Sequence, residues 1–319
     1  MAVLVTGAAG LVGTSVCKKL AEQGHEVVAL DTNRDPALLD LVLTKAQRER
    51  VRFQVGDLLD LPNLLRISRQ FRVDRVVHLA YMITKLTRAN LAYAQKVNVE
   101  GTNNVFELVL ERGIEHLAWA STIDVFGPKS RSENGTVAND AAYDPQTAYG
   151  ACKVLNEIAA RDYALTAGLK AIALRIPAAF GPGVTNSWGG FIPQLIKDLM
   201  EGRRGQAPRL KKARPWLYTE DIADAFVRAL DHCGEAEERG YTLPASEMET
   251  DRVIEMICGF FPGAAIEYVD WPDYGTVPSY DCEPLRRLLR WEPGYGVKDG
   301  LARIIAYYMG AANGSGPPR

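Results

Sequence analysis

The sequence has few side chains that bind metals or form disulfides. It contains four histidines and five cysteines in 319 residues. No two cysteines form a Cys-x-x-Cys pair and the histidines lack metal-ligand spacing, so we expect no bound metal. Scattered cysteines are typical of a reducing compartment, so we expect a cytoplasmic protein. The cysteines are Cys17, Cys152, Cys233, Cys258 and Cys282.

The sequence also lacks a long apolar run and a strong excess of one charge. No apolar stretch reaches the roughly 18 residues that cross a membrane, and no basic segment precedes an apolar core at the N-terminus. A net charge of −2 gives no general attraction to nucleic acid or anionic lipid. We therefore expect no membrane and no nucleic acid as a partner. A hydrophobic content of 47% over 319 residues is enough for a large buried core.

Short apolar segments alternate with helical segments through the first half of the chain. The sequence predicts strands at residues 2–6, 26–30, 51–55, 75–79, 115–120 and 170–176. It predicts helices between them at residues 11–23, 37–47, 60–70, 86–111 and 148–167. The strands are rich in Val, Leu and Ala without polar alternation, which indicates burial on both faces. This order of elements predicts an α/β fold with a Rossmann-type doubly wound parallel sheet.

A glycine-rich segment at residues 6–13, Thr-Gly-Ala-Ala-Gly-Leu-Val-Gly, joins the first predicted strand to the first predicted helix. In this Gly-x-x-Gly-x-x-Gly pattern, Gly7 permits a tight turn and Gly10 lets the backbone approach a pyrophosphate. Gly13 lets helix and strand pack closely. The N-terminus of the helix adds free N–H groups that attract phosphate. The segment therefore predicts a dinucleotide site.

An acidic residue predicts which dinucleotide is bound. Asp31 ends the second predicted strand, 18 residues after Gly13, where a carboxylate accepts hydrogen bonds from the adenosine ribose and repels a 2′-phosphate. This favours NAD over NADP, although the nearby Arg34 could tolerate a phosphate, and Asp31 could instead cap a turn. Asp57 follows the third strand and either meets the adenine edge or serves as a turn carboxylate.

The pattern loosens after residue 177, where glycine-rich turns and shorter helices follow. The sequence predicts further helices at residues 191–201, 220–232, 250–260 and 284–290. We therefore expect an NAD-binding Rossmann domain over residues 1–177 and a smaller C-terminal α/β lobe over residues 178–310 that mainly binds substrate. No flexible linker separates them, so we expect a discontinuous boundary. Residues 311–319 are expected to form a disordered tail.

Several further motifs follow the glycine segment in order. They are Gly56-Asp57, His78-Leu79-Ala80, Asn98-Val99-Glu100-Gly101-Thr102, residues 121–127 (Ser-Thr-Ile-Asp-Val-Phe-Gly), a Tyr149/Lys153 pair, and Leu174-Arg175 before Gly181-Pro182-Gly183. In these motifs, nearly the whole chain resembles the extended short-chain dehydrogenases/reductases, the NAD-dependent epimerase/dehydratase family. The resemblance implies an NAD-dependent enzyme that acts on a small molecule.

The resemblance also implies roles for particular residues. The catalytic residues would be Thr122, Tyr149 and Lys153. With the motifs above, the predicted cofactor contacts are Gly7, Gly10, Leu11, Val12, Gly13, Asp31, Asp57, Leu58, Leu79, Ala80, Asn98, Tyr149, Lys153, Ile176 and Pro177. The predicted substrate contacts are Tyr81, Thr122, Asp124, Ala178 and Arg214.

The Tyr149/Lys153 pair has a chemical reason for its spacing. Residues four apart share one face of a helix. A free phenol has a pKa of about 10, and a nearby ammonium together with the positive nicotinamide ring would favour the phenolate. Tyr149 could then take the hydroxyl proton as hydride leaves the same carbon, with Thr122 orienting the substrate oxygen and Lys153 holding the nicotinamide ribose. Taken alone, such a pair is more often an ordinary surface feature of a helix.

The chain departs from the family pattern at four places that bear on the substrate. Phe126 stands where the family usually has tyrosine, and Cys152 stands where serine usually precedes the lysine. Ile123 and Asp124 replace the Asp-Glu pair of nucleotide-sugar dehydratases. Only one of the two carboxylates that act as acid and base in the elimination of water is therefore present. Ala178 replaces an asparagine that touches the substrate diphosphate, which weakens the case for a nucleotide sugar.

One segment supports a substrate that carries phosphate. Residues 203–214 hold six basic side chains and no acidic one. Arg214 matches the arginine that family members direct at a substrate phosphate, and guanidinium groups bind phosphate well. The segment could equally be a solvated basic loop.

We expect NAD-dependent hydride transfer at a secondary alcohol of a sugar or nucleotide sugar, with hydride returned to the other face as in an epimerase. The alternative is a dehydrogenase that releases NADH and acts on a free sugar, an amino-alcohol or a sterol-like substrate; residues 121–127 resemble those of threonine dehydrogenases. A third hypothesis, a catalytically silent NAD-binding scaffold, is disfavoured by the intact catalytic residues. The resemblance also implies a homodimer joined through the helices near 86–111 and 148–167.

Overall fold

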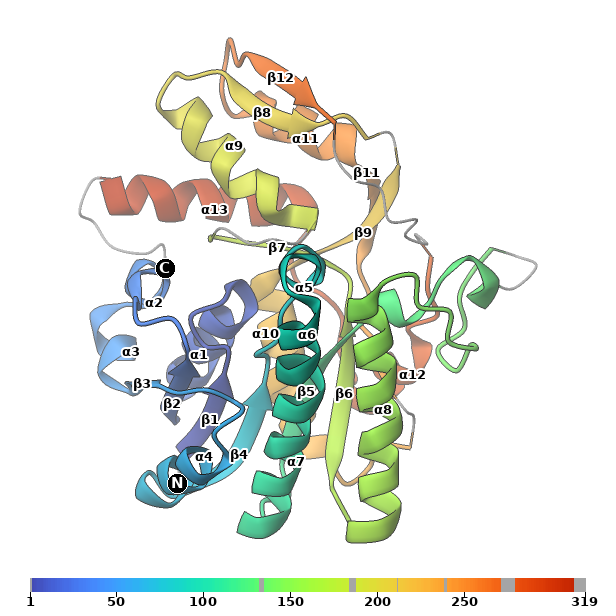
Figure 1. Cartoon of the computed structure of the whole chain (residues 1–319). Helices are drawn as coiled ribbons and strands as arrows, with labels where there is room; N and C mark the ends of the chain where they lie inside the picture. Colours follow the sequence, from blue (N-terminus) through green and yellow to red (C-terminus); the bar gives the residue numbers. More distant parts are fainter. Residues whose placement is uncertain are drawn as a thin grey trace.

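A seven-stranded sheet forms the centre of the protein (Figure 1). The computed structural model describes residues 2–131, 135–183, 188–210, 212–237, 240–270 and 279–312. The sheet consists of β1 (Ala2–Thr6), β2 (Glu26–Asp31), β3 (Val51–Val55), β4 (Val73–His78), β5 (Leu117–Thr122), β6 (Ala171–Ile176) and β10 (Tyr241–Thr242). Its order is β10-β6-β5-β4-β1-β2-β3, and every neighbouring pair runs parallel. This order confirms the Rossmann-type fold predicted from the sequence.

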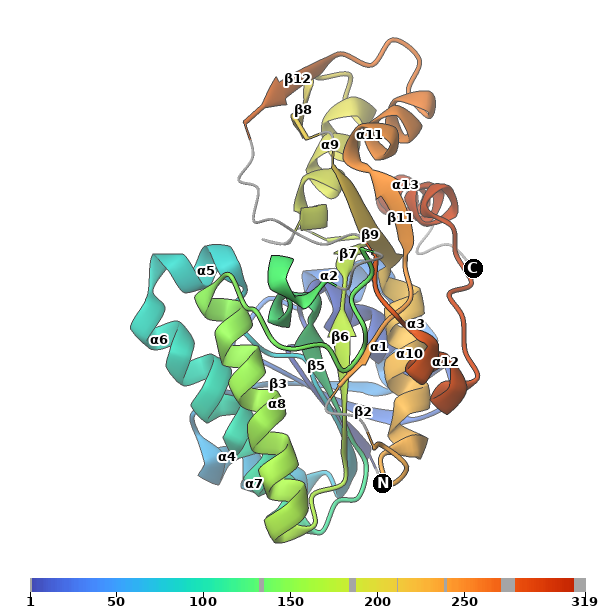
Figure 2. The same ribbon diagram turned by 90° about the vertical axis from the view of Figure 1, so that its right-hand side faces the viewer.

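Helices cover both faces of the sheet (Figures 1 and 2). One face carries α1 (Leu11–Glu22) and α10 (Thr219–Ala229), and the other carries α4 (Leu61–Gln70), α7 (Gly101–Arg112) and α8 (Ala148–Ala167). Successive side chains of β1 pack alternately against the two helical layers. Val3 and Val5 belong to the core cluster that includes α1 and α10, whereas Ala2 and Leu4 belong to the cluster that includes α4 and α7. Burial on both faces explains why β1 and β5 show no polar alternation, whereas the edge strand β3 alternates apolar residues with Arg52 and Gln54.

The smaller lobe sits above the carboxyl edge of the sheet (Figure 2). It contains a three-stranded sheet of β7 (Ala178–Phe180), β9 (Ala213–Tyr218) and β11 (Ser246–Glu249), and a two-stranded sheet of β8 (Gly205–Pro208) and β12 (Ile266–Val269). Helices α9 (Phe191–Met200), α11 (Thr250–Gly259) and α13 (Val297–Ala312) pack around these sheets, while α12 (Glu283–Leu289) lies nearer the main sheet. Although α10 and β10 follow residue 178, they pack on the central sheet or belong to it.

Two helices expected to be continuous are divided, because polar side chains start new helices inside them. Residues 86–111 form α5 (Thr84–Ala89), α6 (Leu91–Gln95), a π-helical turn η1 (Lys96–Glu100) and α7. Asn90 breaks the first of these with an extended φ of −151° and accepts a hydrogen bond from the Tyr93 N–H. Residues 37–47 form α2 (Ala37–Val42) and α3 (Lys45–Glu49), since Thr44 and Gln47 build a capping box there.

The sequence did not predict α13 or the individual strands of the small lobe. These strands span three to six residues, too few for a clear periodic pattern. Helix α13 reaches Ala312, so the first two residues of the expected disordered tail are helical. The rest of that tail, residues 313–319, lies outside the described residues.

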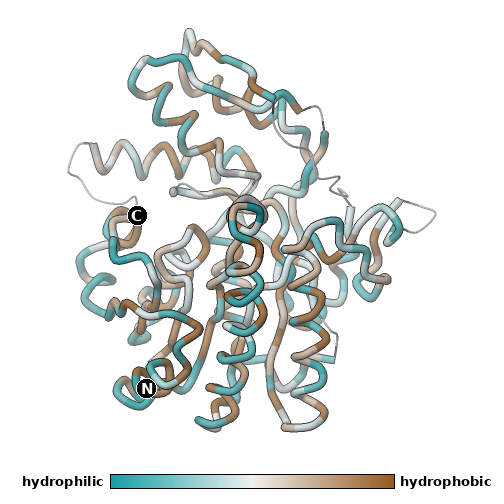
Figure 3. Tube along the Cα trace, viewed as in Figure 1, coloured by the Kyte–Doolittle hydropathy of each residue, from teal (hydrophilic) through white to brown (hydrophobic). Residues whose placement is uncertain are grey.

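Apolar segments follow the strands and the inward sides of the helices, and hydrophilic segments follow the outer turns (Figure 3). Within the described ranges, no helix combines the length and apolar character needed to cross a membrane.

Candidate active site

The carboxyl ends of the parallel strands bring most predicted site residues to one edge of the sheet. The glycine loop follows β1, Asp31 ends β2, and residues 79–81 follow β4. Thr122 ends β5 and Ile176 ends β6. Parallel strands end at the same edge, so residues far apart in sequence meet there, below the small lobe.

The glycine loop has the close packing that its pattern predicts. Gly7 has a φ of 70°, and a Cβ there would lie 2.7 Å from the backbone nitrogen of Ala80. A Cβ at Gly13 would lie 2.1 Å from the carbonyl oxygen of Gly7. Gly10 is exposed, and a Cβ there would approach only that same oxygen, at 3.1 Å. The loop is therefore tightly packed at two glycines and open at the third, where α1 begins, which fits a bound pyrophosphate.

Asp31 lies against this loop. Its carboxylate accepts hydrogen bonds from the N–H groups of Ala9 and Asn33, each at 2.9 Å. These bonds hold the carboxylate beside the open part of the loop, where the adenosine ribose is expected. Arg34 is exposed.

The residues after β3 serve local structure. Asp57 accepts a hydrogen bond from the Leu59 N–H at 3.0 Å, which is the turn role considered above. Leu58 is buried, and its side chain packs where a Cβ on Gly101 of α7 would stand. Contacts of Asp57 and Leu58 with the cofactor stay predictions.

Helix α8 brings Tyr149 and Lys153 to the end of β5. The Thr147 hydroxyl caps this helix by accepting the Gly150 N–H at 3.0 Å. A Cβ at Gly150 would lie 2.2 Å from the carbonyl oxygen of Asp124, so glycine is required for this close approach. The first turns of α8 are thus fixed against the short helical turn that follows β5 (Ile123–Val125).

The predicted catalytic groups lie together and are almost completely buried. Tyr149 is 5% exposed and Lys153 is 0% exposed. The Thr122 and Tyr81 side chains lie near enough to the Tyr149 hydroxyl to shift its pKa, which Thr122 lowers and Tyr81 raises. The Lys153 ammonium donates to the carbonyl oxygen of Ala120 at 2.7 Å. The structure therefore assembles all three predicted catalytic residues at the sheet edge.

Burial dominates the acid–base properties of this pair. It raises the pKa of Tyr149 well above its ordinary value and lowers the pKa of Lys153 to about 7. Burial therefore destabilises the Lys153 ammonium itself. The expected effect of this ammonium and of a bound nicotinamide ring on the Tyr149 phenolate stays a prediction.

A buried hydrogen-bond network connects the glycine loop to α7 and α8. Thr6, at the end of β1, hydrogen-bonds Nδ1 of His78 at 2.8 Å, and Nε2 of His78 lies 3.1 Å from the Thr102 hydroxyl. Asn156 of α8 donates to that hydroxyl at 3.3 Å and to the backbone oxygen of Asn98 at 2.8 Å. Burial lowers the pKa of His78 to about 3, so its ring is neutral. The sequence pointed to Asn98 and the 78–80 motif, but it gave no role to Thr6, the first residue of the glycine segment, and did not indicate Asn156.

Asn98 lies in the π-helical turn η1 and is fully buried. Its side chain accepts the Met82 N–H at 2.7 Å and donates to the Met82 carbonyl at 2.9 Å. Asn98 therefore fixes the segment that follows β4, including Tyr81. π-Helical turns are frequent at functional sites, but a direct contact between Asn98 and the cofactor stays a prediction.

A second buried network holds α8 against β5 and β6. Arg175 of β6 donates two hydrogen bonds to Glu157 of α8, at 2.9 and 2.7 Å, and neither side chain is exposed. Ser121 donates to one oxygen of the same carboxylate at 2.5 Å, and Tyr143 to the other at 2.7 Å. Arg175 also donates to the backbone oxygen of Asn139 at 2.6 Å. This network joins the strand of Thr122, the helix of Tyr149 and the loop between them.

Oppositely charged groups lie on the predicted substrate side. Asp124 is half-buried, and burial raises its pKa to about 6 against the opposing effect of the Arg214 guanidinium. Arg214 is 1% exposed and lies in β9, opposite Met248 of β11. The alternative of a solvated loop is therefore wrong for Arg214. Ala178 is buried at the start of β7, which pairs with β9.

The remainder of the basic segment 203–214 has varied surroundings. Arg203 pairs with Asp198 on the surface at 2.6 Å, and Arg209 lies over the ring of Tyr268 at 5.8 Å. Lys211 lies outside the described residues. Of these cations, Arg214 is the one whose charge acts on a predicted substrate residue.

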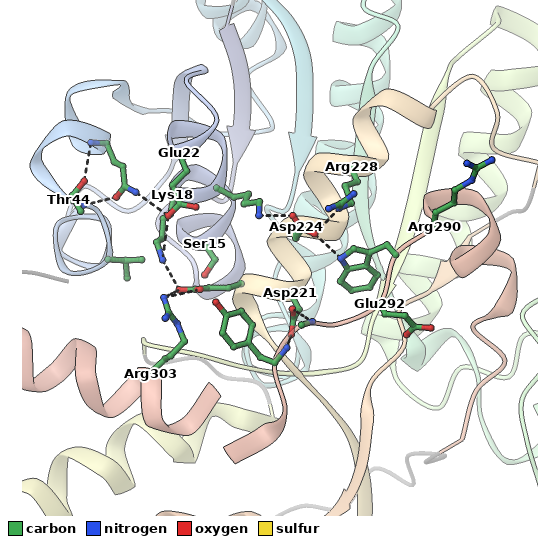
Figure 4. Close-up of a pocket in the computed structure, with 17 residues that line it drawn as sticks. Ser15, Lys18, Glu22, Thr44, Asp221, Asp224, Arg228, Arg290, Glu292 and Arg303 are labelled. Carbon is green, nitrogen blue, oxygen red and sulfur yellow. Dashed lines mark hydrogen bonds and ion pairs between the residues drawn. The ribbon is translucent and has the colours of Figure 1, made fainter. Parts of the chain in front are cut away.

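A separate cavity of about 630 Å³ lies among α1, α10, α13 and the segment after α12 (Figure 4). None of its lining residues is a predicted site residue. Lys18 donates to Glu220 at 2.7 Å and to Tyr307 at 2.8 Å, and Arg303 pairs with Glu220 at 3.2 Å. Asp224, which also lines the cavity, forms ion pairs with further cationic side chains. We interpret this cavity as a gap within an ion-pair cluster that joins α1 to α10 and α13.

Comparisons with known proteins agree with the motifs and the fold. The model of the NAD dependent epimerase/dehydratase family matches residues 3–242. A dTDP-glucose 4,6-dehydratase from Streptomyces griseus is 27% identical over 96% of this chain and 93% of its own length. A D-erythronate dehydrogenase from Cupriavidus necator is 26% identical over 85% of each chain.

Solved structures share the fold. A GalE-like L-threonine dehydrogenase from Cupriavidus necator, in its holo form, superposes with a TM-score of 0.84 at 21% identity, covering 97% of this chain and 100% of that one. A UDP-glucose 4-epimerase from Thermus thermophilus, solved with NAD, gives a TM-score of 0.80 at 25% identity, covering 98% of this chain and 100% of that one. The family match spans the glycine loop, the central sheet and the residues predicted to be catalytic, Thr122, Tyr149 and Lys153. The chain therefore belongs to the NAD dependent epimerase/dehydratase family and is an NAD-dependent enzyme of that family.

Proposed function

We propose that the enzyme transfers hydride between NAD and a secondary alcohol of a sugar or nucleotide sugar, with Tyr149 as the acid/base, and returns it as an epimerase does. The observation that carries this proposal is the placement of the buried Tyr149 and Lys153 on one helix beside Thr122, whose side chain lowers the pKa of Tyr149. A substrate hydroxyl placed between the hydroxyls of Tyr149 and Thr122 could be held by one and deprotonated by the other.

Each residue has a distinct task in this proposal. Tyr149 takes the proton from the substrate hydroxyl on oxidation and returns it on reduction. Thr122 orients the substrate oxygen, and Lys153 holds the nicotinamide ribose. NAD, when bound, supplies the hydride acceptor and a positive ring that favours the Tyr149 phenolate. The open face at Gly10 and the adjacent Asp31 would hold its pyrophosphate and adenosine ribose.

The division of labour between the two parts of the chain is also a proposal. We assign NAD binding to residues 1–177 and most of the substrate contacts to residues 178–310. The position of the small lobe above the glycine loop and the catalytic residues supports this assignment. The buried Arg214 would then meet an anionic group of the substrate.

A second candidate is a dehydrogenase that releases NADH. The Arg214 guanidinium acts to lower the pKa of Asp124, so it already has an acidic neighbour on the predicted substrate side. Such an arrangement suits a small polar substrate as well as a diphosphate. The D-erythronate and L-threonine dehydrogenases among the similar proteins show that the family fold serves such enzymes.

Turnover assays separate the two candidates. The purified protein is incubated with UDP-sugars without added NAD, and epimers are sought by NMR. In parallel it is incubated with NAD and free sugars, sugar acids or amino-alcohols while NADH absorbance is followed. We expect an epimer without net NADH. Net NADH from an alcohol would replace the leading proposal by the second, and no turnover in either arm would contradict both.

We further propose that the protein is a homodimer joined through α8. The outer side of this helix carries Leu155, Ile158 and Leu165, which are 47%, 44% and 75% exposed. Their spacing puts them on one side of the helix, and α7 lies beside it (Figure 1). Exposed apolar stripes of this kind mark protein interfaces.

Replacing Ile158 by arginine should convert the dimer to a monomer, because it places a charge in the centre of this stripe. Molar mass measured by light scattering during size-exclusion chromatography reports the change. Tyr268→Arg is the matched control, since Tyr268 is 44% exposed but lies on β12 in the small lobe. A monomeric parent protein, or an Ile158→Arg variant that stays dimeric, would contradict the proposal.

We also place the enzyme in the cytoplasm. All five cysteines are free thiols, and four of them are buried. A reducing compartment suits a chain with this cysteine content.

A further inference from the structure

His78 ends β4, the strand that lies between β1 and β5 in the main sheet (Figure 1). Its ring is fully buried and meets a threonine hydroxyl at each nitrogen. Thr6 lies 2.8 Å from Nδ1, and Thr102 lies 3.1 Å from Nε2. Because Thr6 directly precedes the turn at Gly7 and Thr102 belongs to α7, the ring joins the glycine loop to the helical layer.

The Thr6 hydroxyl determines which ring nitrogen carries the proton. Its oxygen accepts the backbone N–H groups of Leu79 and Ala80, at 3.2 and 3.4 Å. A hydroxyl oxygen has two positions that accept and one hydrogen to donate. Since backbone donors take both accepting positions, Thr6 donates its hydrogen to Nδ1 of His78. Nδ1 is therefore the nitrogen without a proton.

The Thr102 hydroxyl leads to the same assignment. It donates its hydrogen to the backbone oxygen of Asn98 at 2.8 Å, so its oxygen is left to accept. The donors that meet this oxygen are Nε2 of His78, at 3.1 Å, and the side-chain amide of Asn156, at 3.3 Å. Burial lowers the pKa of His78 to about 3. The ring is therefore neutral, with its one proton on Nε2.

We propose that His78, protonated on Nε2, is a positioning residue that holds the glycine loop and helix α8 in a fixed relation to each other. The inference rests on the proposed function, because it assumes that this loop binds NAD and that α8 carries the acid/base. A neutral imidazole suits the task, since it offers an acceptor and a donor at separate points of one rigid ring.

At the loop end, the bond from Thr6 controls a close backbone contact. Thr6 holds the N–H groups of residues 79 and 80, and a Cβ on Gly7 would lie 2.7 Å from the backbone nitrogen of Ala80. The tight turn of the glycine loop thus packs directly on the segment that follows His78. Without an acceptor at Nδ1, the Thr6 hydroxyl would lose its orientation and this turn would be less well fixed.

At the helix end, the path reaches the face of α8 that carries the predicted catalytic residues. Asn156 follows Tyr149 by seven positions and Lys153 by three, so the three side chains share one side of α8. The Asn156 amide donates to the Thr102 hydroxyl that His78 also meets. Without a donor at Nε2, this hydroxyl would lose one of the two groups that hold it against α8.

Nuclear magnetic resonance tests the tautomer directly. The protein is labelled with ¹⁵N at histidine and loaded with NAD, and long-range ¹H–¹⁵N correlations are recorded at neutral pH. The His78 signals are those missing from the spectrum of a His78→Gln variant. We expect the pattern of a neutral ring with its proton on Nε2. A ring protonated on Nδ1, or on both nitrogens, would overturn the inference.

Two substitutions interrupt the path at opposite ends. His78→Asn places an amide oxygen near the position of Nδ1 and removes the donor to Thr102, whereas His78→Gln places an amide N–H near Nε2 and removes the acceptor for Thr6. The dissociation constant for NADH, measured by fluorescence without substrate, should rise at least about fivefold in His78→Gln and less than about twofold in His78→Asn. In turnover, His78→Asn should lower kcat at least about tenfold, because small displacements of an acid/base are costly.

His116→Gln is the matched control. His116 is a partly buried histidine that precedes the start of β5, and its Nδ1 lies 2.7 Å from the backbone oxygen of Leu230. This variant should change neither NADH binding nor kcat, and thermal unfolding verifies that each variant folds. Equal effects of the two folded His78 variants on NADH binding would overturn the inference. If Tyr149→Phe retained parental turnover, the proposed function would fail instead, while the tautomer and the NADH measurements would still decide the role of His78.

Discussion

Replacing Tyr149 by phenylalanine is expected to lower kcat by about 100- to 10,000-fold, the range typical for loss of a positioned acid/base. The phenol oxygen is the only part removed, and it belongs to the group whose pKa the neighbouring Thr122 lowers. The ring stays packed against Tyr81, so the pocket keeps its shape. NADH binding should persist, because the glycine loop, Asp31 and Lys153 are unchanged. Steady-state turnover and fluorescence titration of NADH measure the two effects.

Tyr163→Phe is the matched control on the same helix. Its hydroxyl donates to Glu107 of α7 at 2.7 Å, far along α8 from the catalytic residues. This variant should keep parental turnover. A Tyr149→Phe enzyme that turns over at the parental rate would show that another group transfers the proton.

Glu157→Gln should lower the free energy of unfolding by roughly 3–5 kcal/mol, the usual cost of breaking a buried ion pair on one side. The fully buried Arg175 side chain would keep its positive charge but would lose the carboxylate that neutralises it. Ser121 and Tyr143 would also lose a charged acceptor. Urea unfolding, with the midpoint and the slope compared between variants, measures the loss.

A surface pair supplies the control for this prediction. Lys170 and Glu115 lie 2.6 Å apart with side chains 48% and 64% exposed, so Lys170→Gln should cost less than about 1 kcal/mol. The double variant Glu157→Leu/Arg175→Met should recover part of the stability, because apolar pairs often replace buried ion pairs at little cost. A Glu157→Gln protein as stable as the parent would mean that the pair is not held as the structure shows.

Much of the fold could be predicted from the sequence because its signals are local. Strands such as β1 and β5 are short and mainly apolar, and the glycine pattern stands at the first strand–helix junction. The two-residue strand β10 gave no such signal. The parallel arrangement then places Thr122 and the other strand-end residues on one edge. The spacing of Tyr149 and Lys153 on one helix is local too.

The features that the sequence did not predict depend on residues that are far apart in the sequence and meet only in the fold. Nothing near Glu157 in the sequence indicates that Arg175 and Ser121 bind it, since β5 and β6 come together only in the folded sheet. The lowered pKa of Lys153 arises from burial by residues as distant as Tyr81, and sequence spacing cannot report burial. Asn90 interrupts a helical pattern that its neighbours would continue. Its side chain caps a new helix there, and this one interaction outweighs the weak helix propensities of the surrounding residues.

The short strand β10 has a consequence for biosynthesis. It closes the open edge of β6, yet it lies more than sixty residues further along the chain, and its Thr242 N–H is held at 3.0 Å by Asn139. The nascent polypeptide cannot complete its central sheet until that stretch has left the ribosome. A truncation after residue 177 would present an unpaired β-edge and lack α10, which invites self-association. Expression of the part that contains the central sheet therefore needs the chain through residue 242.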